Sequence, residues 1–200
     1  MQAYGKSFAR VYNLRWGDFG RHVAPRIRTF YEGTALGRAN RDLLDVCCGT
    51  GQLAVHFLER GYRVTGIDLS EEMLHCAREN AAPYLERGQA RFLQGDAADF
   101  CLADRFGLAV STFDALNHLP DEASLRACFE CVRQVLLPGG TFIFDLNTRA
   151  GLRSGWNGIS VQDTQEATII NRGFYDDGAG KAWVKISGYL RVENGLYERF

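Results

Sequence analysis

The sequence predicts an α/β fold built on a doubly wound, mainly parallel sheet that helices cover on both faces. Between residues 42 and 146, short apolar runs alternate with segments of helical period. Turns rich in glycine separate them. Strands that alternate with helices are joined by right-handed crossovers, which place helices on both faces of a parallel sheet.

Each element follows from its local pattern. Five apolar runs are predicted as strands, at residues 42–48, 62–69, 90–97, 106–113 and 140–146. Three segments have the helical period, at residues 51–61, 70–88 and 121–140. Ser70 precedes the second of these helices and is a suitable N-cap, whereas Pro138 and Gly139 are expected to end the third.

The segments on either side of this block differ in character. Residues 1–36 are rich in aromatic and basic side chains, and we expect lid helices over one end of the sheet. Residues 166–177 and 181–192 alternate apolar and polar side chains around the turn DDGAGK, which predicts an antiparallel hairpin. A chain of 200 residues fits a single domain, with a lid (1–36), a central sheet (37–147) and a hairpin extension (148–200).

Composition narrows the classes of function. The chain has 46% hydrophobic and 24% charged residues and a formal net charge of -1, so nothing indicates nucleic acid or an anionic membrane as a partner. No apolar run approaches the ~18 residues of a membrane span, and residues 1–12 lack the apolar core of a signal peptide, which favours a cytoplasmic location.

The cysteines form no disulfide-scaffold pattern, and we expect reduced thiols. Cys128 and Cys131 make a CxxC on one face of a predicted helix, without the second ligand pair that a metal site needs. Core packing is therefore the expected role, and no metal is expected. The other cysteines are Cys47, Cys48, Cys76 and Cys101.

The segment LLDVCCGTG carries Gly49 and Gly51 in the turn after the first strand, where a doubly wound sheet binds its ligand. GTGQLA also fits the dinucleotide pattern G-x-G-x-x-G/A, with Asp68 near the distance expected for a ribose contact. A nicotinamide dinucleotide is therefore one alternative. A turn that only lets the helix pack closely on the strand is another.

Three carboxylates argue against the dinucleotide. Asp45 ends the first strand, and an acid there suits a cationic ligand end better than a pyrophosphate. Asp68 ends the second strand, where its carboxylate can accept both ribose hydroxyls. Asp96 follows the third strand and is suited to accept from an adenine amino group. Together they indicate a nucleoside that carries an aminoacyl sulfonium tail.

At these motifs the chain resembles the class I S-adenosylmethionine-dependent methyltransferases, which have a Rossmann-like fold, over about residues 35 to 147. The segments that resemble the family's five successive motifs are LLDVCCGTGQLA, VTGIDLSEEML, FLQGDAADF, LAVSTFDALNHL and LLPGGTFIFDL. The resemblance implies S-adenosyl-L-methionine as the cofactor and in-line methyl transfer to a small-molecule N, O or C nucleophile. A non-catalytic S-adenosylmethionine-binding module and a truncated, inactive methyltransferase are the alternatives.

The resemblance also assigns cofactor-binding residues. Asp68 holds the ribose, and the glycine turn lies against the methionine part. Four residues after the second and third strands surround the adenine: Leu69, Met73, Asp96 and Ala97. The complete set adds Tyr12, Asp45, Cys47, Gly49, Gly51 and Phe113.

Two of these positions involve further choices. Cys47 stands where many family members have glycine. The segment YGKSFARVYNLRW resembles the small-molecule branch, in which a tyrosine reaches the cofactor carboxylate, so Tyr12 is the first candidate and Tyr4 the second. Packing of an aromatic lid helix on the sheet is the competing role for either tyrosine.

The methyl acceptor is expected after the fourth strand, by the same resemblance. His118 is the candidate proton acceptor there, with capping or packing of the next helix as the favoured alternative. Asn117 and Asp114 either position the acceptor or cap that helix. A dedicated base is optional, because the sulfonium is already an activated leaving group and alignment and desolvation supply much of the rate.

The hairpin extension is expected to roof the acceptor site. Its large aromatic side chains either cover the pocket or hold the hairpin together through cross-strand pairs: Trp156, Phe174, Tyr175, Trp183 and Tyr189. The C-terminal strand pair that is usual in the family is not found after the hairpin. We therefore expect a truncated or short member, or a homodimer in which a partner chain completes the sheet edge.

Overall fold

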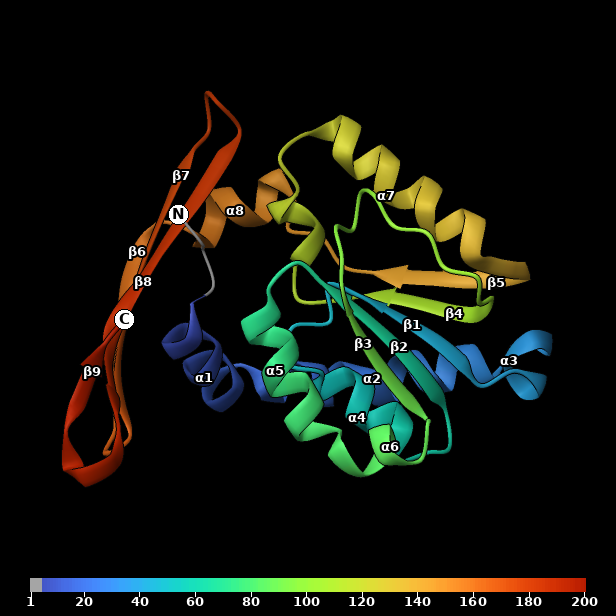
Figure 1. Ribbon diagram of the computed structural model, residues 1–200. Coiled ribbons are helices and arrows are strands. Elements are labelled where there is room, and N and C mark those ends of the chain that lie inside the picture. Colours follow the sequence, from blue (N-terminus) through green and yellow to red (C-terminus); the bar gives the residue numbers. More distant parts are fainter. Residues whose placement is uncertain (1–4) are drawn as a thin grey trace. The chain divides into compact units, whose positions relative to one another are not determined.

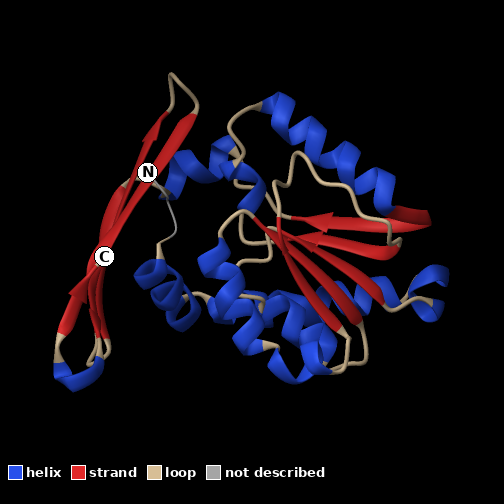
Figure 2. Cartoon of the chain, in the orientation of Figure 1, coloured by secondary structure: helices blue, strands red, loops and turns tan. Residues whose placement is uncertain are grey.

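The computed structural model describes residues 5–200 and divides into two compact units, Met1–Leu146 and Asn147–Phe200. The first unit is an α/β fold whose five strands are all parallel, in the order β3-β2-β1-β4-β5 (Figures 1 and 2). Their bounds are β1 Asp42–Val46, β2 Arg63–Asp68, β3 Ala90–Gln94, β4 Phe106–Ser111 and β5 Leu136–Phe144. The predicted parallel sheet is confirmed, and strand order reverses between β1 and β4.

Helices cover both faces of this sheet (Figure 1). One face carries α2 (Gly17–Glu32), α4 (Gln52–Leu58) and α5 (Glu71–Asn80), and the other carries α7 (Glu122–Val135). The shorter helices of this unit are α1 (Lys6–Arg15), α3 (Ala35–Ala39), α6 (Ala82–Glu86) and the 3-10 turn η1 (Ala115–His118). Ser70 is the N-cap of α5, as predicted, because its hydroxyl accepts from the Met73 N–H at 3.3 Å.

Two helix boundaries differ from the sequence prediction. The segment predicted as one helix over residues 70–88 is two helices, and Pro83 lies in the first turn of the second, where its missing N–H costs nothing. The predicted stop at Pro138 is wrong, because α7 ends at Val135 and Leu136 is already extended. A proline disfavours the helical conformation in the residue before it, so the chain leaves the helix upstream.

The core lies on either side of the sheet. The cluster under α2 and α4 includes Ala24, Ile27 and Tyr31 of α2, so this helix is part of the core. Tyr31 is fully buried, and its hydroxyl donates to the Asn40 carbonyl at 3.3 Å. A Cβ at Gly107 would lie 2.1 Å from that hydroxyl, so β4 approaches Tyr31 in a way that only glycine permits.

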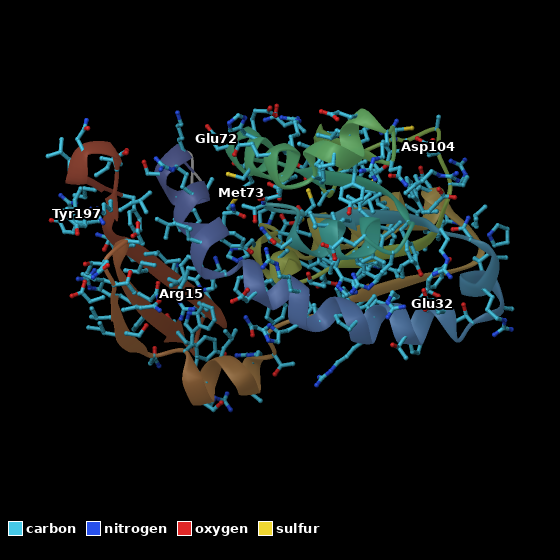
Figure 3. All side chains as sticks on the ribbon, turned by 90° about the horizontal axis from the view of Figure 1, so that it is seen from below. Arg15, Glu32, Glu72, Met73, Asp104 and Tyr197 are labelled. Atoms are coloured by element: carbon cyan, nitrogen blue, oxygen red, sulfur yellow. The ribbon has the colours of Figure 1, made fainter. Side chains whose placement is uncertain are left out.

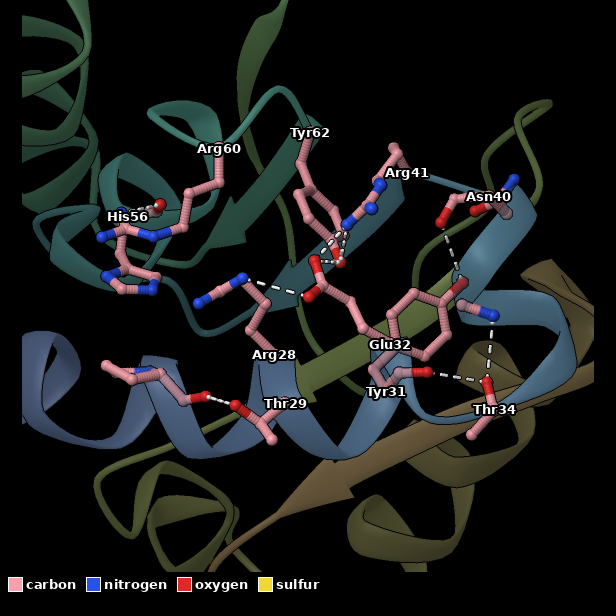
Figure 4. A network of polar contacts seen from close by, with 12 residues as sticks. Arg28, Thr29, Tyr31, Glu32, Thr34, Asn40, Arg41, His56, Arg60 and Tyr62 are labelled. Carbon is pink, nitrogen blue, oxygen red and sulfur yellow. Dashed lines mark hydrogen bonds and ion pairs between the residues drawn. The ribbon is translucent and has the colours of Figure 1, made fainter.

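A polar network fixes α2 to the amino ends of β1 and β2 (Figure 4). The carboxylate of Glu32 accepts from Arg28 at 3.0 Å, from Arg41 and from the Tyr62 hydroxyl at 3.2 Å. Arg41 also donates to Tyr62 at 2.8 Å. Burial tends to raise the pKa of Glu32, but these donors and the two cations lower it overall. The network holds the helix at the end of the sheet opposite to the glycine turn.

The second unit is an antiparallel sheet of order β6-β7-β8-β9 that follows a short helix. Its elements are α8 (Arg149–Gly155), β6 (Gly158–Asp163), β7 (Ala167–Asp176), β8 (Lys181–Arg191), η2 (Glu193–Gly195) and β9 (Tyr197–Arg199). The predicted hairpin is confirmed as β7 and β8, whereas α8, β6 and β9 were not predicted. Phe174 and Trp183 are register partners whose rings stack at 5.7 Å, so cross-strand pairing is one role of these aromatics.

Within residues 5–200, no helix is long and apolar enough to cross a membrane. No group of three or more His, Cys, Asp or Glu side chains is arranged to hold a metal ion in this part of the chain. Cys128 is fully buried in the cluster under α7, and Cys131 is partly buried, with its thiol 3.7 Å from the Ala98 carbonyl.

Candidate functional site

The turn after β1 is built from left-handed residues. Cys47, Gly49 and Gly51 have φ values of 59°, 55° and 73°. A Cβ at Gly51 would lie 3.0 Å from the Cβ of Ala77, so α5 packs against this position. Cys47 adopts the left-handed conformation although it carries a side chain, which is a strained arrangement at a position where the resembled family often has glycine.

Asp68 connects the end of β2 to this turn. Its Oδ2 accepts from the Gly49 N–H at 2.8 Å, and its Oδ1 accepts from the Ser70 N–H at 2.9 Å. Burial raises the pKa of Asp68, while these backbone bonds lower it. Each carboxylate oxygen has further lone pairs, so Asp68 can hold the turn and still accept from a ligand hydroxyl.

Asp45 is the buried acid of the site, with 2% of its surface exposed. Burial, and then the charge of Asp68, raise the pKa of Asp45 to about 8. Among the residues that the structure describes, none makes a hydrogen bond to its buried Oδ2. A buried carboxyl oxygen without a partner is costly unless a ligand completes it, and a cationic group does so best.

A cavity adjoins the turn, with an empty volume of about 380 Å³ that includes space open to solvent. Its aromatic wall joins three elements, since the Phe113 ring lies 5.9 Å from Tyr12 of α1 and 4.7 Å from Phe19 of α2. The lining residues are Tyr12, Trp16, Gly17, Phe19, Gly20, Asp45, Cys47, Cys48, Thr50, Gln52, Leu53, Thr112 and Phe113.

Four of the predicted site residues therefore meet at the cavity, namely Tyr12, Asp45, Cys47 and Phe113. Tyr12 also lies next to the glycine turn, because a Cβ at Gly49 would be 3.7 Å from its ring. Tyr4, the second candidate tyrosine, lies outside the described residues.

The residues assigned to the adenine lie around the ends of β2 and β3. Leu69 is 70% exposed, whereas Met73 is buried against α1 (Figure 3). Ala97 is buried, and the exposed Asp96 accepts from the Ala98 N–H at 2.8 Å in a local turn. An exposed apolar Leu69 and an accessible carboxylate are compatible with a ligand that covers them.

The turn after β4 is held from β5. Phe113 and Asp114 are both left-handed, with φ values of 65° and 49°. The Asp145 carboxylate accepts from the Asp114 N–H at 3.0 Å, and the Asp145 N–H donates to the Ser111 carbonyl at 3.3 Å. Sequence reasoning missed Asp145, although GTFIFDL places an acid at a strand end as the first strand does.

The three candidate catalytic residues lie at and beyond this turn. The alternative role was capping of the next helix, but the N-cap of α7 is Asp121, whose carboxylate accepts from the Ser124 N–H at 2.8 Å, so none of the three candidates caps that helix. Asn117 and His118 are exposed and are not among the residues that line the cavity. The structure thus places Phe113 at the cavity wall and these polar groups further along the same segment.

Comparison with known proteins identifies the family. The profile of a methyltransferase domain matches residues 43–140. A ubiquinone biosynthesis O-methyltransferase of Pasteurella multocida (strain Pm70) is 31% identical over 171 residues, which cover 80% of this chain and 68% of that protein. A crystal structure of an S-adenosylmethionine-dependent methyltransferase from Clostridium acetobutylicum ATCC 824 superposes with a TM-score of 0.71 at 26% identity, covering 97% of this chain and 77% of the other. The chain belongs to the class I S-adenosylmethionine-dependent methyltransferases.

Other relatives of this methyltransferase chain are matched over less of their length. The dTDP-3-amino-3,4,6-trideoxy-alpha-D-glucopyranose N,N-dimethyltransferase of Streptomyces venezuelae is 35% identical over 103 residues, which are 52% of this chain and 41% of that enzyme. The chain spans about half the length of several curated relatives, between 38% and 63%. All of these relatives are methyltransferases by name, which favours an enzyme over a non-catalytic module or a dinucleotide-binding protein.

The residues of this methyltransferase fit S-adenosyl-L-methionine, the cofactor of the family. The unpartnered Oδ2 of Asp45 suits a cationic group. The left-handed Gly49 leaves room beside it, since within residues 5–200 Tyr12 alone comes within 4 Å of a Cβ built there. Asp68 retains acceptor capacity for a ribose at the adjoining strand end.

Proposed function

We propose that this chain catalyses transfer of a methyl group from S-adenosyl-L-methionine to a small-molecule nucleophile. The single observation that carries this proposal is the buried Asp45 carboxyl, whose Oδ2 has no hydrogen-bond partner among the described residues, beside an aromatic-lined cavity and a left-handed glycine turn. A cationic ligand end would supply what Asp45 lacks, and aromatic faces attract a cation as well.

The proposed cofactor contacts follow the strand ends. Asp45 and Tyr12 bind the methionine part beside the glycine turn, and Asp68 binds the ribose. Leu69, Met73, Asp96 and Ala97 surround the adenine, since the first three lie at or near the ends of β2 and β3 and Ala97 is buried beside them. Cys47 and Phe113 line the cavity next to these contacts.

The bound cofactor supplies an activated methyl group, so the protein's tasks are alignment and exclusion of water. The aromatic wall of Tyr12, Phe19 and Phe113 performs the second task. We assign Asp114 and Asn117 to orientation of the acceptor and His118 to removal of its proton. Asp114 follows Phe113 of the cavity wall, and Asn117 and His118 lie in η1 just beyond it, which supports this assignment.

The proposed class of methyl acceptor is based on the names of the relatives. Two of them act on amino groups of dTDP-linked sugars, and others on hydroxyls in ubiquinone biosynthesis, according to their names. We propose an amine or hydroxyl of a small molecule, with amino sugars as the first compounds to test. Within one methyltransferase domain, residues 1–36 would serve as the lid, 37–147 would bind the cofactor and 148–200 would determine acceptor specificity. A cytoplasmic location and a homodimer belong to the same proposal.

The test is methyl transfer from radiolabelled S-adenosylmethionine to a panel of amino-sugar nucleotides, hydroxylated aromatics and simple amines. We expect label in at least one acceptor and loss of that label in an Asp45→Asn variant. Calorimetry should show tighter binding of S-adenosylmethionine than of nicotinamide dinucleotides. Binding of the cofactor without transfer to any acceptor class would contradict the proposed activity and leave a binding module.

A further inference from the structure

We propose that Asn13 is a positioning residue for the cofactor site, because its amide oxygen fastens helix α1 to the glycine turn and so holds Tyr12 beside Gly49. Asn13 Oδ1 accepts from Gln52 Nε2 at 2.8 Å and from Asn80 Nδ2 at 2.9 Å. Asn80 Nδ2 also donates to the Thr50 carbonyl at 2.8 Å. One oxygen therefore joins α1 to the start of α4 and the end of α5, at the turn between Gly49 and Gly51.

The orientation of each amide is fixed by an unambiguous partner. Arg21 can only donate, and its Nε lies 3.0 Å from Gln52 Oε1, so the nitrogen of Gln52 must face Asn13. The Thr50 carbonyl can only accept, so the nitrogen of Asn80 must face both Thr50 and Asn13. Asn13 consequently presents its oxygen to two donors, and a side chain without an acceptor cannot replace it.

The packing around Gln52 leaves little room for other arrangements. Gln52 is buried, with 8% of its surface exposed. A Cβ at Gly17 would lie 3.1 Å from Gln52 Cγ, and a Cβ at Gly20 would lie 3.0 Å from the Leu53 N. The first turns of α2 thus press directly on the start of α4, and the amide of Gln52 is confined between Arg21 and Asn13.

Helix α1 depends on such contacts for its position. It has ten residues, and its N-cap Gly5 makes no side-chain cap bond. Isolated helices of that length are marginal in water. Its apolar contacts are formed by Phe8, Ala9 and Tyr12 against Met73 and Cys76 of α5, and Val11 is fully buried. The Asn13 bonds add a polar, directional constraint immediately next to Tyr12 in the sequence.

The consequence for the cofactor rests on the proposed function. Tyr12 of α1 and Trp16, the residue between α1 and α2, form part of the cavity wall, so movement of α1 opens the cavity. Loss of the Asn13 bonds should therefore speed cofactor release and loosen the Thr50 carbonyl. The side chains assigned to the methyl transfer itself stay in place. The effect is expected in the cofactor KM and dissociation rate more than in kcat.

Three near-isosteric variants of the full chain separate this role from general stability. Asn13→Asp keeps an oxygen that accepts from both amides, with charge-assisted bonds. Asn13→Leu removes the acceptor. Gln52→Glu keeps the bond from Arg21 but turns a second oxygen toward Asn13. This oxygen needs a donor, whereas the Asn80 amide nitrogen needs an acceptor, so neither orientation of the Asn13 amide satisfies both. Hydrogen exchange of residues 6–16 and 49–53 is measured without cofactor, and the dissociation constant and rate of S-adenosylmethionine are measured with it.

We expect faster exchange in both segments for Asn13→Leu and Gln52→Glu, and a loss of about tenfold in cofactor affinity, mostly in the dissociation rate. Asn13→Asp should stay close to the wild type in every measurement. Equal exchange in all four proteins would overturn the proposal, and so would an Asn13→Asp variant as impaired as Asn13→Leu. If Asn13→Leu does not fold, the comparison of Asn13→Asp with Gln52→Glu tests the proposal, because only Gln52→Glu should show faster exchange and weaker cofactor binding. If the wild type fails to bind the cofactor, the proposed function is wrong, while the exchange data still test the role of Asn13.

Discussion

The carboxylate of Asp68, at the end of β2, accepts a hydrogen bond from the backbone N–H of Gly49 at 2.8 Å. This bond spans two neighbouring parallel strands and fixes the turn that follows β1. The acid assigned to ribose binding is therefore also part of the scaffold that shapes the site. Substitutions at Asp68 should change both stability and ligand affinity, and the two effects can be measured separately.

Asp68→Ala is expected to weaken S-adenosylmethionine binding by about tenfold to over a hundredfold, because the ribose loses charge-assisted bonds of about 1.5–3 kcal/mol. The Gly49 and Ser70 N–H groups also lose their acceptor. We therefore expect a lower melting temperature without cofactor. Calorimetry and thermal melts on the same preparation check both effects. Unchanged affinity in a folded variant would remove Asp68 from the site.

Asp45→Asn should abolish a pH dependence of cofactor binding. The pKa of Asp45 is about 8 in the folded chain, so this group is mostly protonated at pH 7. A cationic ligand end prefers the ionised form, and binding at pH 7 should release a proton. We expect wild-type affinity to rise between pH 6 and about 8 and then level off. Calorimetry in buffers of different ionisation enthalpy measures the number of protons released on binding. The same measurement on Asp45→Asn corrects for titration of the ligand itself.

The same pKa predicts the sign of a stability effect. The folded-state pKa lies above the ordinary value of 3.8, so the folded chain binds the proton more tightly than the unfolded chain. The stability that this proton contributes is complete below pH ~4 and is lost as pH rises toward about 8. Without cofactor, Asp45→Asn should therefore gain melting temperature relative to the wild type as pH increases from about 5 to about 9. A constant difference across that range would contradict the assigned pKa.

Gly51→Ala is expected to destabilise the chain more than Gly61→Ala. Both glycines are left-handed, at φ values of 73° and 79°, so each substitution costs about 1–2 kcal/mol of backbone strain. At Gly61 no atom of the described residues beyond its chain neighbours lies within 4 Å of the new Cβ, whereas at Gly51 the new Cβ lies 3.0 Å from Ala77 Cβ and adds a further ~1–3 kcal/mol of overpacking. Denaturant unfolding measures the difference. Equal losses would show that α5 yields to the added methyl group.

Asp145→Ala should loosen the turn that carries Phe113. The Asp114 N–H loses its acceptor, which costs about 1–3 kcal/mol, and two left-handed residues lose the contact that restrains them. Asp145→Asn retains one carbonyl oxygen and should recover part of the loss. Urea unfolding and cofactor affinity are the measurements. An Ala variant as stable as the wild type would mean that Ser111 and the aromatic contacts alone fix this turn.

Much of the first unit could be predicted because its signals are local. The alternation of apolar runs with helical periods indicated the five strands and their parallel crossovers, and the hydroxyl of Ser70 marked the start of α5. The end of α7 could not be predicted in the same way. Leu136 continues the helical period but pairs with Phe106 of β4, a contact that no local pattern contains. β6 and β9 were missed for a related reason, since β6 is largely exposed and β9 has only three residues.

In the candidate site, too, residues with a local sequence signal could be predicted and residues that depend on tertiary packing could not. Asp45 and Asp68 could be assigned because each lies at the carboxyl end of an apolar strand, and the carboxyl ends of parallel strands share one edge. Trp16, Phe19 and Asn13 could not, because their roles depend on how α1 and α2 pack on the glycine turn. Asp145 could in principle have been identified from the sequence, as an acid at a strand end. Its observed contact, however, is to the backbone N–H of Asp114, which is far away in sequence.

The close approach of β4 to Tyr31 has a consequence for biosynthesis. Helix α2 leaves the ribosome before β4, but Gly107 of β4 forms part of the surroundings of the buried Tyr31. Until β4 emerges, the apolar side of α2 has no complete partner and is available to chaperones or to neighbouring nascent chains. Slow translation between residues 32 and 107 should therefore lower the yield of folded protein, and faster passage through that stretch should raise it.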